Sequence, residues 1–211
     1  MNGDQRRATD TSGSPTRGKL IDATQRLLAA GGTDALSSRA IASAAGANLA
    51  SITYYFGSKE QLVTESLIGA ARELLAPVVA TLSADGDPTT KMLESAALLI
   101  RILDEHRDKL VAYVQALAAA TANPAIAATL RALQRDITKL LSQQIRAQLA
   151  AEELPSWISP DAMAQLIVSV MHGTLLGSVI DPKRIDPAAI GAQFAQLLIG
   201  VRTPGAGDSR P

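Results

Sequence analysis

Five of the ten prolines in this chain follow a small polar residue and mark the starts of helices. Proline's fixed φ and missing N–H suit the first turn of a helix, and a preceding Ser, Asn or Asp can accept hydrogen bonds from the exposed amides. Each pair is followed by apolar residues at helical spacing. The pattern predicts helices that begin at Ser14-Pro15, Asp87-Pro88, Asn123-Pro124, Ser159-Pro160 and Asp186-Pro187.

The composition also favours an all-α fold. Hydrophobic residues make up 47% of the chain and aromatic residues only 3%, a balance that suits close-packed helices better than sheets. The chain has no cysteine, which excludes disulfide scaffolds, thiolate metal sites and cysteine nucleophiles. Its formal net charge is zero, so overall basicity gives no argument for a nucleic-acid partner.

Further signals divide the chain between these prolines. A capping box at 58–61 predicts a long helix that reaches about Leu82, with a bend at Pro77. The polar cluster 105–108 predicts a break between two helices. In all, we expect about nine helices.

The two ends of the chain lack residues that could be buried. Residues 1–13 and 203–211 are rich in polar residues, Gly and Pro, and we expect them to be disordered tails. The N-terminal segment is polar, and no apolar run is expected to approach the ~20 residues that cross a bilayer. We therefore expect a soluble, cytoplasmic protein with no membrane partner.

The segment 37–56 has the pattern of two short helices joined by a tight turn. Ser37 can cap the first helix, Gly46 can supply a left-handed turn, and Asn48 can cap the second. Four apolar residues can then face inward: Ile41, Ala45, Ile52 and Phe56. This arrangement predicts a helix-turn-helix.

The outer face of the second short helix carries unusual residues for a solvated surface. Small, hydroxyl and aromatic side chains stand where Lys and Glu are usual: Leu49, Ala50, Ser51, Thr53 and Tyr54. Small residues let a backbone approach a duplex, hydroxyls can bond phosphates or base edges, and apolar groups can meet a thymine methyl. The face therefore favours contact with the major groove of DNA.

Motifs in the first third of the chain resemble those of the TetR (tetracycline-repressor) family. They are the helix 16–31, Ser38-Arg39-Ala40-Ile41-Ala42, Ala45-Gly46 and Tyr54-Tyr55-Phe56-Gly57-Ser58-Lys59-Glu60-Gln61-Leu62. The resemblance implies a transcription regulator with an N-terminal three-helix helix-turn-helix domain and a larger C-terminal helical domain. It also implies a homodimer that binds a palindromic double-stranded operator and is more often a repressor than an activator.

By position, the resemblance also implies roles for single residues. Ser38 and Lys59 resemble phosphate contacts and Arg39 a base contact. The recognition-helix set comprises Leu49, Ala50, Ser51, Thr53, Tyr54 and Tyr55. Thr53 stands where many relatives have tyrosine, so the separate roles of the last three residues stay open, and Tyr55 could instead pack inside the domain. We expect a DNA-binding domain at 14-60 and a ligand-binding and dimerisation domain at 61-202.

Apolar residues recur at helical spacing through the C-terminal two-thirds, and most of them must form the core. We expect a minority to line a pocket for a small, mostly apolar effector: Leu98, Ile102, Tyr113, Leu117, Leu133, Ile137, Met171 and His172. His172 could instead be a hydrogen-bonded core residue or a dimer-interface residue. Trp157 could cap the pocket or cover a helix end.

The last two predicted helices, 160–180 and 187–201, are apolar over much of their circumference and carry small residues such as Gly173 and Gly177. By resemblance, they meet their symmetry mates in a four-helix bundle. This arrangement implies a two-fold dimer interface.

Two other classes of function compete with DNA binding. A helical di-metal enzyme needs a Glu-x-x-His pair on each of two helices, and neither His106 nor His172 follows such a glutamate. We therefore expect no catalytic residue, no metal and no cofactor. A helical adaptor without DNA binding fits the neutral charge, but the outer face of the helix at 49–55 argues against it.

Overall fold

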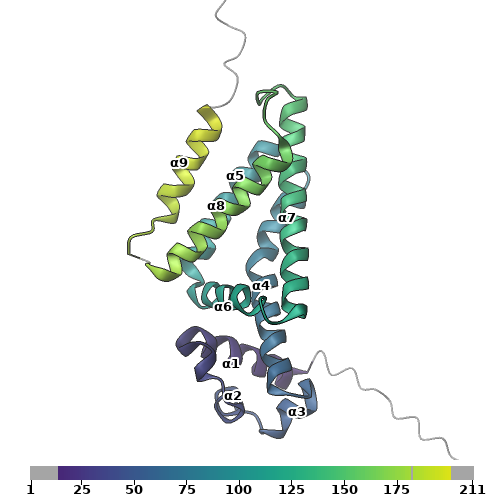
Figure 1. The fold of residues 1–211 in the computed structure, drawn as a ribbon, viewed down its shortest axis with the longest axis vertical. Coiled ribbons are helices and arrows are strands. Elements are labelled where there is room, and N and C mark those ends of the chain that lie inside the picture. Colours follow the sequence, from purple (N-terminus) through teal and green to yellow (C-terminus); the bar gives the residue numbers. More distant parts are fainter. Residues whose placement is uncertain (1–13, 182, 201–211) are drawn as a thin grey trace, which may run out of the picture.

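The structure is a computed structural model that describes residues 14–181 and 183–200 (Figure 1). Its small N-terminal part comprises α1 (Pro15–Gly31), a 3₁₀ turn (Gly32–Ala35), α2 (Ser38–Ala45) and α3 (Ala50–Phe56). A long helix, α4 (Lys59–Ser83), leads into the larger part, which adds α5 (Pro88–Glu105), α6 (Arg107–Ala119), α7 (Pro124–Ala150), α8 (Pro160–Ile180) and α9 (Pro187–Gly200). The described residues thus form nine α-helices and no strand, which confirms the all-α prediction.

All five proline-marked helix starts are confirmed. The residue before the proline caps four of them by accepting hydrogen bonds from backbone amides: Asp87, Asn123, Ser159 and Asp186. Ser14 differs, because its hydroxyl donates instead to the hydroxyl of Tyr55 on α3, 2.9 Å away. The start of α1 is therefore fixed by contact with another helix.

The remaining helix boundaries also follow local signals. Ser58 Oγ accepts from the Gln61 amide at 3.0 Å, which starts α4 as the capping box predicted. The Gln61 side-chain amide donates to Glu65 at 3.3 Å. The break between α5 and α6 falls at His106, inside the predicted polar cluster.

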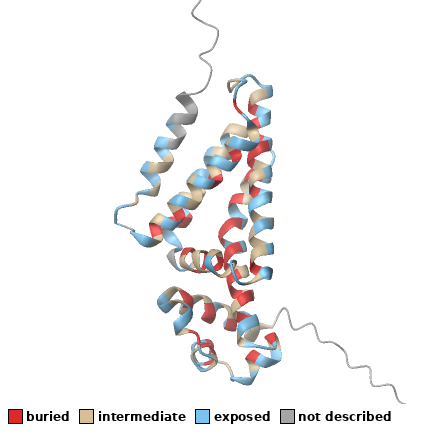
Figure 2. Ribbon diagram, viewed as in Figure 1, coloured by how far each residue is buried: buried red, intermediate tan, exposed pale blue. Residues whose placement is uncertain are grey.

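Two hydrophobic cores share helix α4 (Figure 2). Near its start, Leu62 and Leu67 pack into the N-terminal core with residues of α1, α2 and α3. Further along, Leu74, Leu75 and Leu82 pack into the C-terminal core with residues of α5 to α8. The same helix is therefore part of both domains.

Helix α6 lies across the lower end of the larger domain, beside α1 (Figure 1). Its Ala116 is fully buried in the N-terminal core, whereas Leu110 and Tyr113 belong to the C-terminal core. Helices α4 and α6 therefore join the domains, and α7 also reaches both cores, through Ile126 in the N-terminal one and Ile137 in the C-terminal one.

The expectation that no apolar run approaches membrane-spanning length needs correction. Among the described residues, α4 and α8 are long and apolar enough to cross a membrane by length and composition, and the bent pair α6–α7 would add a third span. The apolarity of α4 has a structural cause, because α4 is packed inside both cores. Helix α8 instead leaves large apolar side chains exposed, namely Leu166, Leu176 and Ile180.

We expect Asn123 to contribute to stability through both ends of its amide. Its Oδ1 accepts from the first amides of α7, and its Nδ2 donates to Thr64 on α4 at 3.0 Å. Asn123→Ala should lower the free energy of unfolding in urea by about 1–2 kcal/mol. Asn123→Asp is the matched control and should retain most of that stability, because aspartate still caps α7. Equal losses in the two variants would contradict a capping role.

Candidate nucleic-acid interface and C-terminal cavity

The turn between α2 and α3 is built by local hydrogen bonds and one glycine. Ser37 Oγ accepts from the Ala40 amide at 3.1 Å, and Asn48 Oδ1 accepts from the Ala50 amide at 2.9 Å. Gly46 ends α2 with φ 61° and ψ 34°, a left-handed conformation that a Cβ would strain. The four residues expected to face inward are all buried: Ile41, Ala45, Ile52 and Phe56.

The outer face of this helix-turn-helix presents the residues predicted from the sequence. Five of the nine candidate DNA-binding residues are exposed: Arg39, Leu49, Ala50, Thr53 and Tyr54. Among them, Tyr54 is 67% exposed and Leu49 46%. The other four are partly buried: Ser38, Ser51, Tyr55 and Lys59. The face is thus apolar and hydroxyl-bearing, with one exposed arginine beside it.

The two neighbouring tyrosines of α3 have different surroundings. Their rings meet edge to face, with centroids 4.8 Å apart. Tyr55 packs against the N-terminal core and accepts a hydrogen bond from Ser14, which ties the start of α1 to α3. Tyr54 therefore projects outward while Tyr55 is held inside the domain.

The basic residues around the helix-turn-helix are also distinguished by their contacts. Lys59, at the start of α4, donates from Nζ to the Leu36 carbonyl at 3.4 Å and remains partly exposed. Arg17 is paired with Glu65, and its guanidinium lies 5.0 Å from the centre of the Phe56 ring. Arg17 therefore stabilises the domain interior, whereas Lys59 remains accessible at a helix start, where backbone amides favour an anion.

A cavity of about 240 Å³ lies in the C-terminal domain. Helices α4, α5, α7, α8 and α9 and the segment before α8 line it with mostly aliphatic and methionine side chains. The lining includes Val78 and Leu82 from α4, so the helix that starts at the nucleic-acid face ends at the cavity.

The eight candidate ligand-binding residues do not all line the same space. Ile137 and Met171 line the cavity. Leu98 and Ile102, on another face of α5, line a separate hollow beside α4 and α6. Neither of these two spaces is lined by the remaining four candidates, which are Tyr113, Leu117, Leu133 and His172. Trp157 is 72% exposed and lines neither space.

Four polar residues line the cavity that no sequence pattern assigns to a pocket. They are Thr89, Ser95, Gln148 and Thr174. A serine or glutamine within a helix is usually a solvated residue, so no local signal separates these four from the other polar residues of their helices.

Tyr113 and His172 contact each other and so link α6 to α8. The Tyr113 hydroxyl lies 3.0 Å from His172 Nε2, and the two rings are nearly parallel, at 12°. Burial raises the pKa of Tyr113 to about 12 and lowers the pKa of His172, although a hydrogen bond with the Val168 backbone partly opposes the latter shift. The pair is therefore neutral near pH 7, with the phenol placed to donate to the imidazole.

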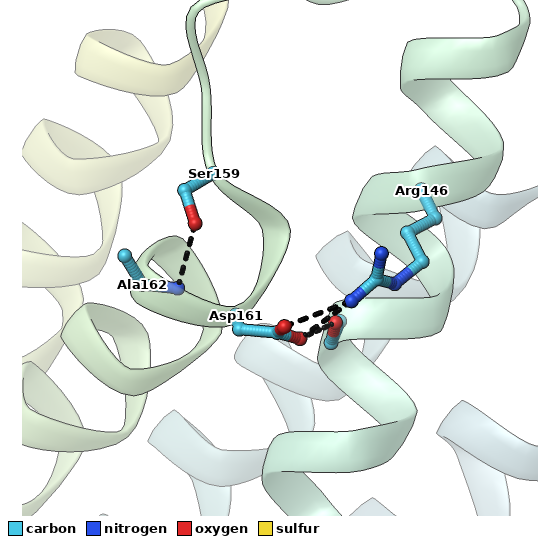
Figure 3. A network of polar contacts seen from close by, with 5 residues as sticks. Arg146, Ser159, Asp161 and Ala162 are labelled. Carbon is cyan, nitrogen blue, oxygen red and sulfur yellow. Dashed lines mark hydrogen bonds and ion pairs between the residues drawn. The ribbon is translucent and has the colours of Figure 1, made fainter.

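A polar network joins α7 to the start of α8 (Figure 3). Asp161 accepts from Arg146 Nη2 at 2.8 and 2.9 Å and from the hydroxyl of Ser142. The Ser142 hydrogen bond is the main cause that lowers the pKa of the Asp161 carboxyl, followed by the Arg146 hydrogen bond. Leu141 and Ile145, close to Ser142 on the same helix, line the cavity, whereas the ion pair itself is largely exposed to solvent.

Comparisons with known proteins agree with this architecture. Residues 20–65 match bacterial regulatory proteins of the tetR family, and residues 88–200 match the C-terminal region of BetI-type transcriptional repressors. No significantly similar sequence was found among curated proteins.

Several solved structures share the fold. A TetR transcription regulator from Haloarcula marismortui has a TM-score of 0.78 and 16% identity, over 89% of this chain and 98% of that one. A proposed transcriptional regulator from Saccharomonospora viridis in complex with choline has a TM-score of 0.77 and 18% identity, over 88% and 96%. SmeT in complex with triclosan has a TM-score of 0.74 and 16% identity, over 92% and 94%.

A helix-turn-helix on a small N-terminal domain, joined by a long helix to a larger helical domain, defines a DNA-binding transcriptional regulator. The C-terminal family match alone spans more than half of the 211 residues. The chain belongs to the TetR family, as its motifs predicted, and members of this family are non-enzymatic DNA-binding proteins.

The buried histidine predicts a pH-dependent stability. Folding lowers the pKa of His172 below its ordinary value of 6.5, so the unfolded chain binds a proton at this residue more readily than the folded one. The folded state is therefore most stable above pH 6.5, where the imidazole is neutral in both states, and loses stability as the pH falls below 6.5. We expect the free energy of unfolding in urea to decrease between about pH 7 and pH 5, and to decrease less in His172→Gln. His106→Gln changes the exposed histidine and should retain the wild-type dependence. An unchanged slope in His172→Gln would show that this histidine does not couple to folding.

Proposed function

We propose that this TetR-family regulator is a ligand-responsive repressor. As a homodimer it binds a palindromic operator, and a small, mostly apolar effector in the cavity releases it from DNA. The observation that carries this proposal is the position of α4, which has Lys59 at the nucleic-acid face and Val78 and Leu82 in the cavity wall. One helix therefore contacts both sites.

Release requires that the effector bind more tightly to a conformation that does not fit the operator. Filling the cavity pushes on the far end of α4, and any tilt of this helix moves the N-terminal core that packs on Leu62 and Leu67. In a dimer, such movement changes the separation of the two recognition helices. Successive major grooves are about 34 Å apart, so a changed separation weakens operator binding.

We propose that residues 14-60 bind DNA and that residues 61-202 bind the effector and form the dimer. In the DNA-binding part, we propose that Tyr54, Thr53 and Leu49 meet bases while Ser38 and Lys59 meet phosphates. In the larger part, Ile137 and Met171 contact the effector directly. Tyr113 and His172 act through the link between α6 and α8.

Two structural neighbours support a small-molecule effector, since one is a complex with choline and the other a complex with triclosan. The cavity of this chain lies in its C-terminal domain. Its lining is mostly hydrocarbon, which favours an apolar molecule.

Dimerisation is supported by the outer face of α8. Leu166, Leu176 and Ile180 are 50%, 45% and 73% exposed, an apolar surface that a partner would remove from water. Gly173 lies among them on the same helix, and a Cβ added there would meet nothing within 4 Å of this chain. We propose that a second copy of α8 packs against this face.

The dimer proposal predicts the effect of a bulky residue at Gly173. Gly173→Leu should fold normally, because the space around the glycine is open within one chain, yet it should shift the protein towards monomer. Gly18→Leu, at a similarly open helical glycine on α1, is the matched control and should leave assembly unchanged. Sedimentation velocity at micromolar concentration is the measurement. A wild-type monomer, or a Gly173→Leu dimer as tight as wild type, would refute this interface.

The DNA-binding proposal predicts two distinct losses in gel-shift and salt titrations on the protein's own promoter. Lys59→Ala should weaken binding to all sequences and reduce the slope of log affinity against log salt by about 1, because one phosphate contact is lost. Tyr54→Ala should also alter the preference among operator variants. Lys139→Ala removes an exposed lysine of α7 and should have no effect. Unchanged binding in the first two variants would disprove the assignment of this face.

A further inference from the structure

The described residues that line the cavity carry no charge and no aromatic ring. Among the described residues that line it, none is acidic, basic, Phe, Tyr or Trp. An ion that enters such a wall loses its hydration without gaining a partner. Quaternary ammonium groups in particular are held in other proteins by aromatic cages, and none of the described lining residues supplies an aromatic face. The lining therefore disfavours ions of either sign.

One buried polar group in this wall lacks a partner. Ser95 of α5 is only 4% exposed. In the described part of the chain, its hydroxyl oxygen is the one buried polar side-chain atom that forms no hydrogen bond. The neighbouring polar groups are engaged, since Gln148 Nε2 donates to Met92 Sδ at 3.4 Å and Thr174 donates to the Val170 carbonyl at 2.9 Å. A buried hydroxyl left unpaired is costly, so a ligand that pairs with it gains affinity.

The size and shape of the cavity set a further limit. An apolar cavity of roughly 150 Å³ holds a benzene molecule, so about 240 Å³ accommodates roughly ten non-hydrogen atoms. The lining residues of α5 extend from Thr89 to Leu103, a length of roughly 21 Å at the rise of an α-helix. Ser95 lies within this stretch of α5, so its hydroxyl can reach a molecule in the cavity.

We propose that the effector is an uncharged, mainly hydrocarbon molecule of about ten non-hydrogen atoms whose single hydroxyl or carbonyl group hydrogen-bonds to Ser95 Oγ. Ser95 is then the residue that selects among apolar ligands. The cavity rejects carboxylates and quaternary ammonium ions of the same size. That the bound molecule acts as an effector rests on the proposed function. Its binding to the cavity does not, because binding is measured on the protein without DNA.

Four probes of matched size test this chemistry on the full chain by calorimetry: phenylbutanol, butylbenzene, phenylbutyrate and benzyltrimethylammonium. Phenylbutanol should bind tightest, and both ions should bind at least about tenfold more weakly. Ser95→Ala should weaken phenylbutanol binding about three- to tenfold and leave butylbenzene binding unchanged. The same variant should raise the unfolding temperature of the ligand-free protein, because it removes the unpaired hydroxyl.

Ser66→Ala is the matched control, because Ser66 is a buried serine of α4 outside the cavity whose hydroxyl donates to the Leu62 carbonyl at 2.8 Å. It should leave all four affinities unchanged. The inference is overturned if either ion binds as tightly as phenylbutanol, or if no probe binds. It is also overturned if Ser95→Ala affects phenylbutanol and butylbenzene equally.

Operator release is measured separately and distinguishes the two proposals. Phenylbutanol that binds through Ser95 without weakening operator affinity would refute effector-driven release and leave the cavity chemistry intact. Release by benzyltrimethylammonium but not by phenylbutanol would preserve ligand-responsive regulation and overturn the neutral-ligand inference.

Discussion

The rest of the structure depends on the burial of α4 in two hydrophobic cores at once. Leu62 is fully buried in the N-terminal core, and Leu74 and Leu75 are almost fully buried in the C-terminal one. Truncating such a leucine typically costs about 2–5 kcal/mol, so neither core can easily release the helix. Helix α4 continues through Pro77, where one backbone hydrogen bond is missing, so the two cores are joined along a single helix that is weakest at this proline. The two domains are therefore mechanically joined even though their cores are separate.

Helix α6 gives the domains a second connection with a different character. Its Ala116 packs in the N-terminal core through apolar contact, whereas Tyr113 reaches α8 through a hydrogen bond to His172. Burial keeps both partners neutral, so this bond links the helices without an uncompensated charge in the interior. A polar bond of this kind depends on geometry more strongly than apolar packing does, which makes the contact between α6 and α8 sensitive to small displacements.

Helix α8 is apolar on two sides, one of which lines the cavity while the other is exposed. One side of α8 supplies Met163, Ile167 and Met171 to the cavity wall, while another side exposes Leu166 and Leu176. The network of Asp161 with Arg146 and Ser142 holds the first turn of α8 against α7. The proposed effector and the proposed second copy of α8 would therefore meet different sides of the same helix.

The sequence by itself determined the helix starts, the helix-turn-helix and the family, because caps, prolines and the turn at Gly46 act within a few residues of the chain. It could not determine which apolar residues line the cavity. Leu98 and Ile102 share helical spacing with Leu99 and Leu103, yet only the latter two face the cavity. Likewise, Tyr113 and His172 are 59 residues apart, and Ser95 resembles any other helical serine. These features depend on how distant helices pack, and only the tertiary structure decided them, because the apolar pattern along one helix does not specify which neighbour each of its faces will meet.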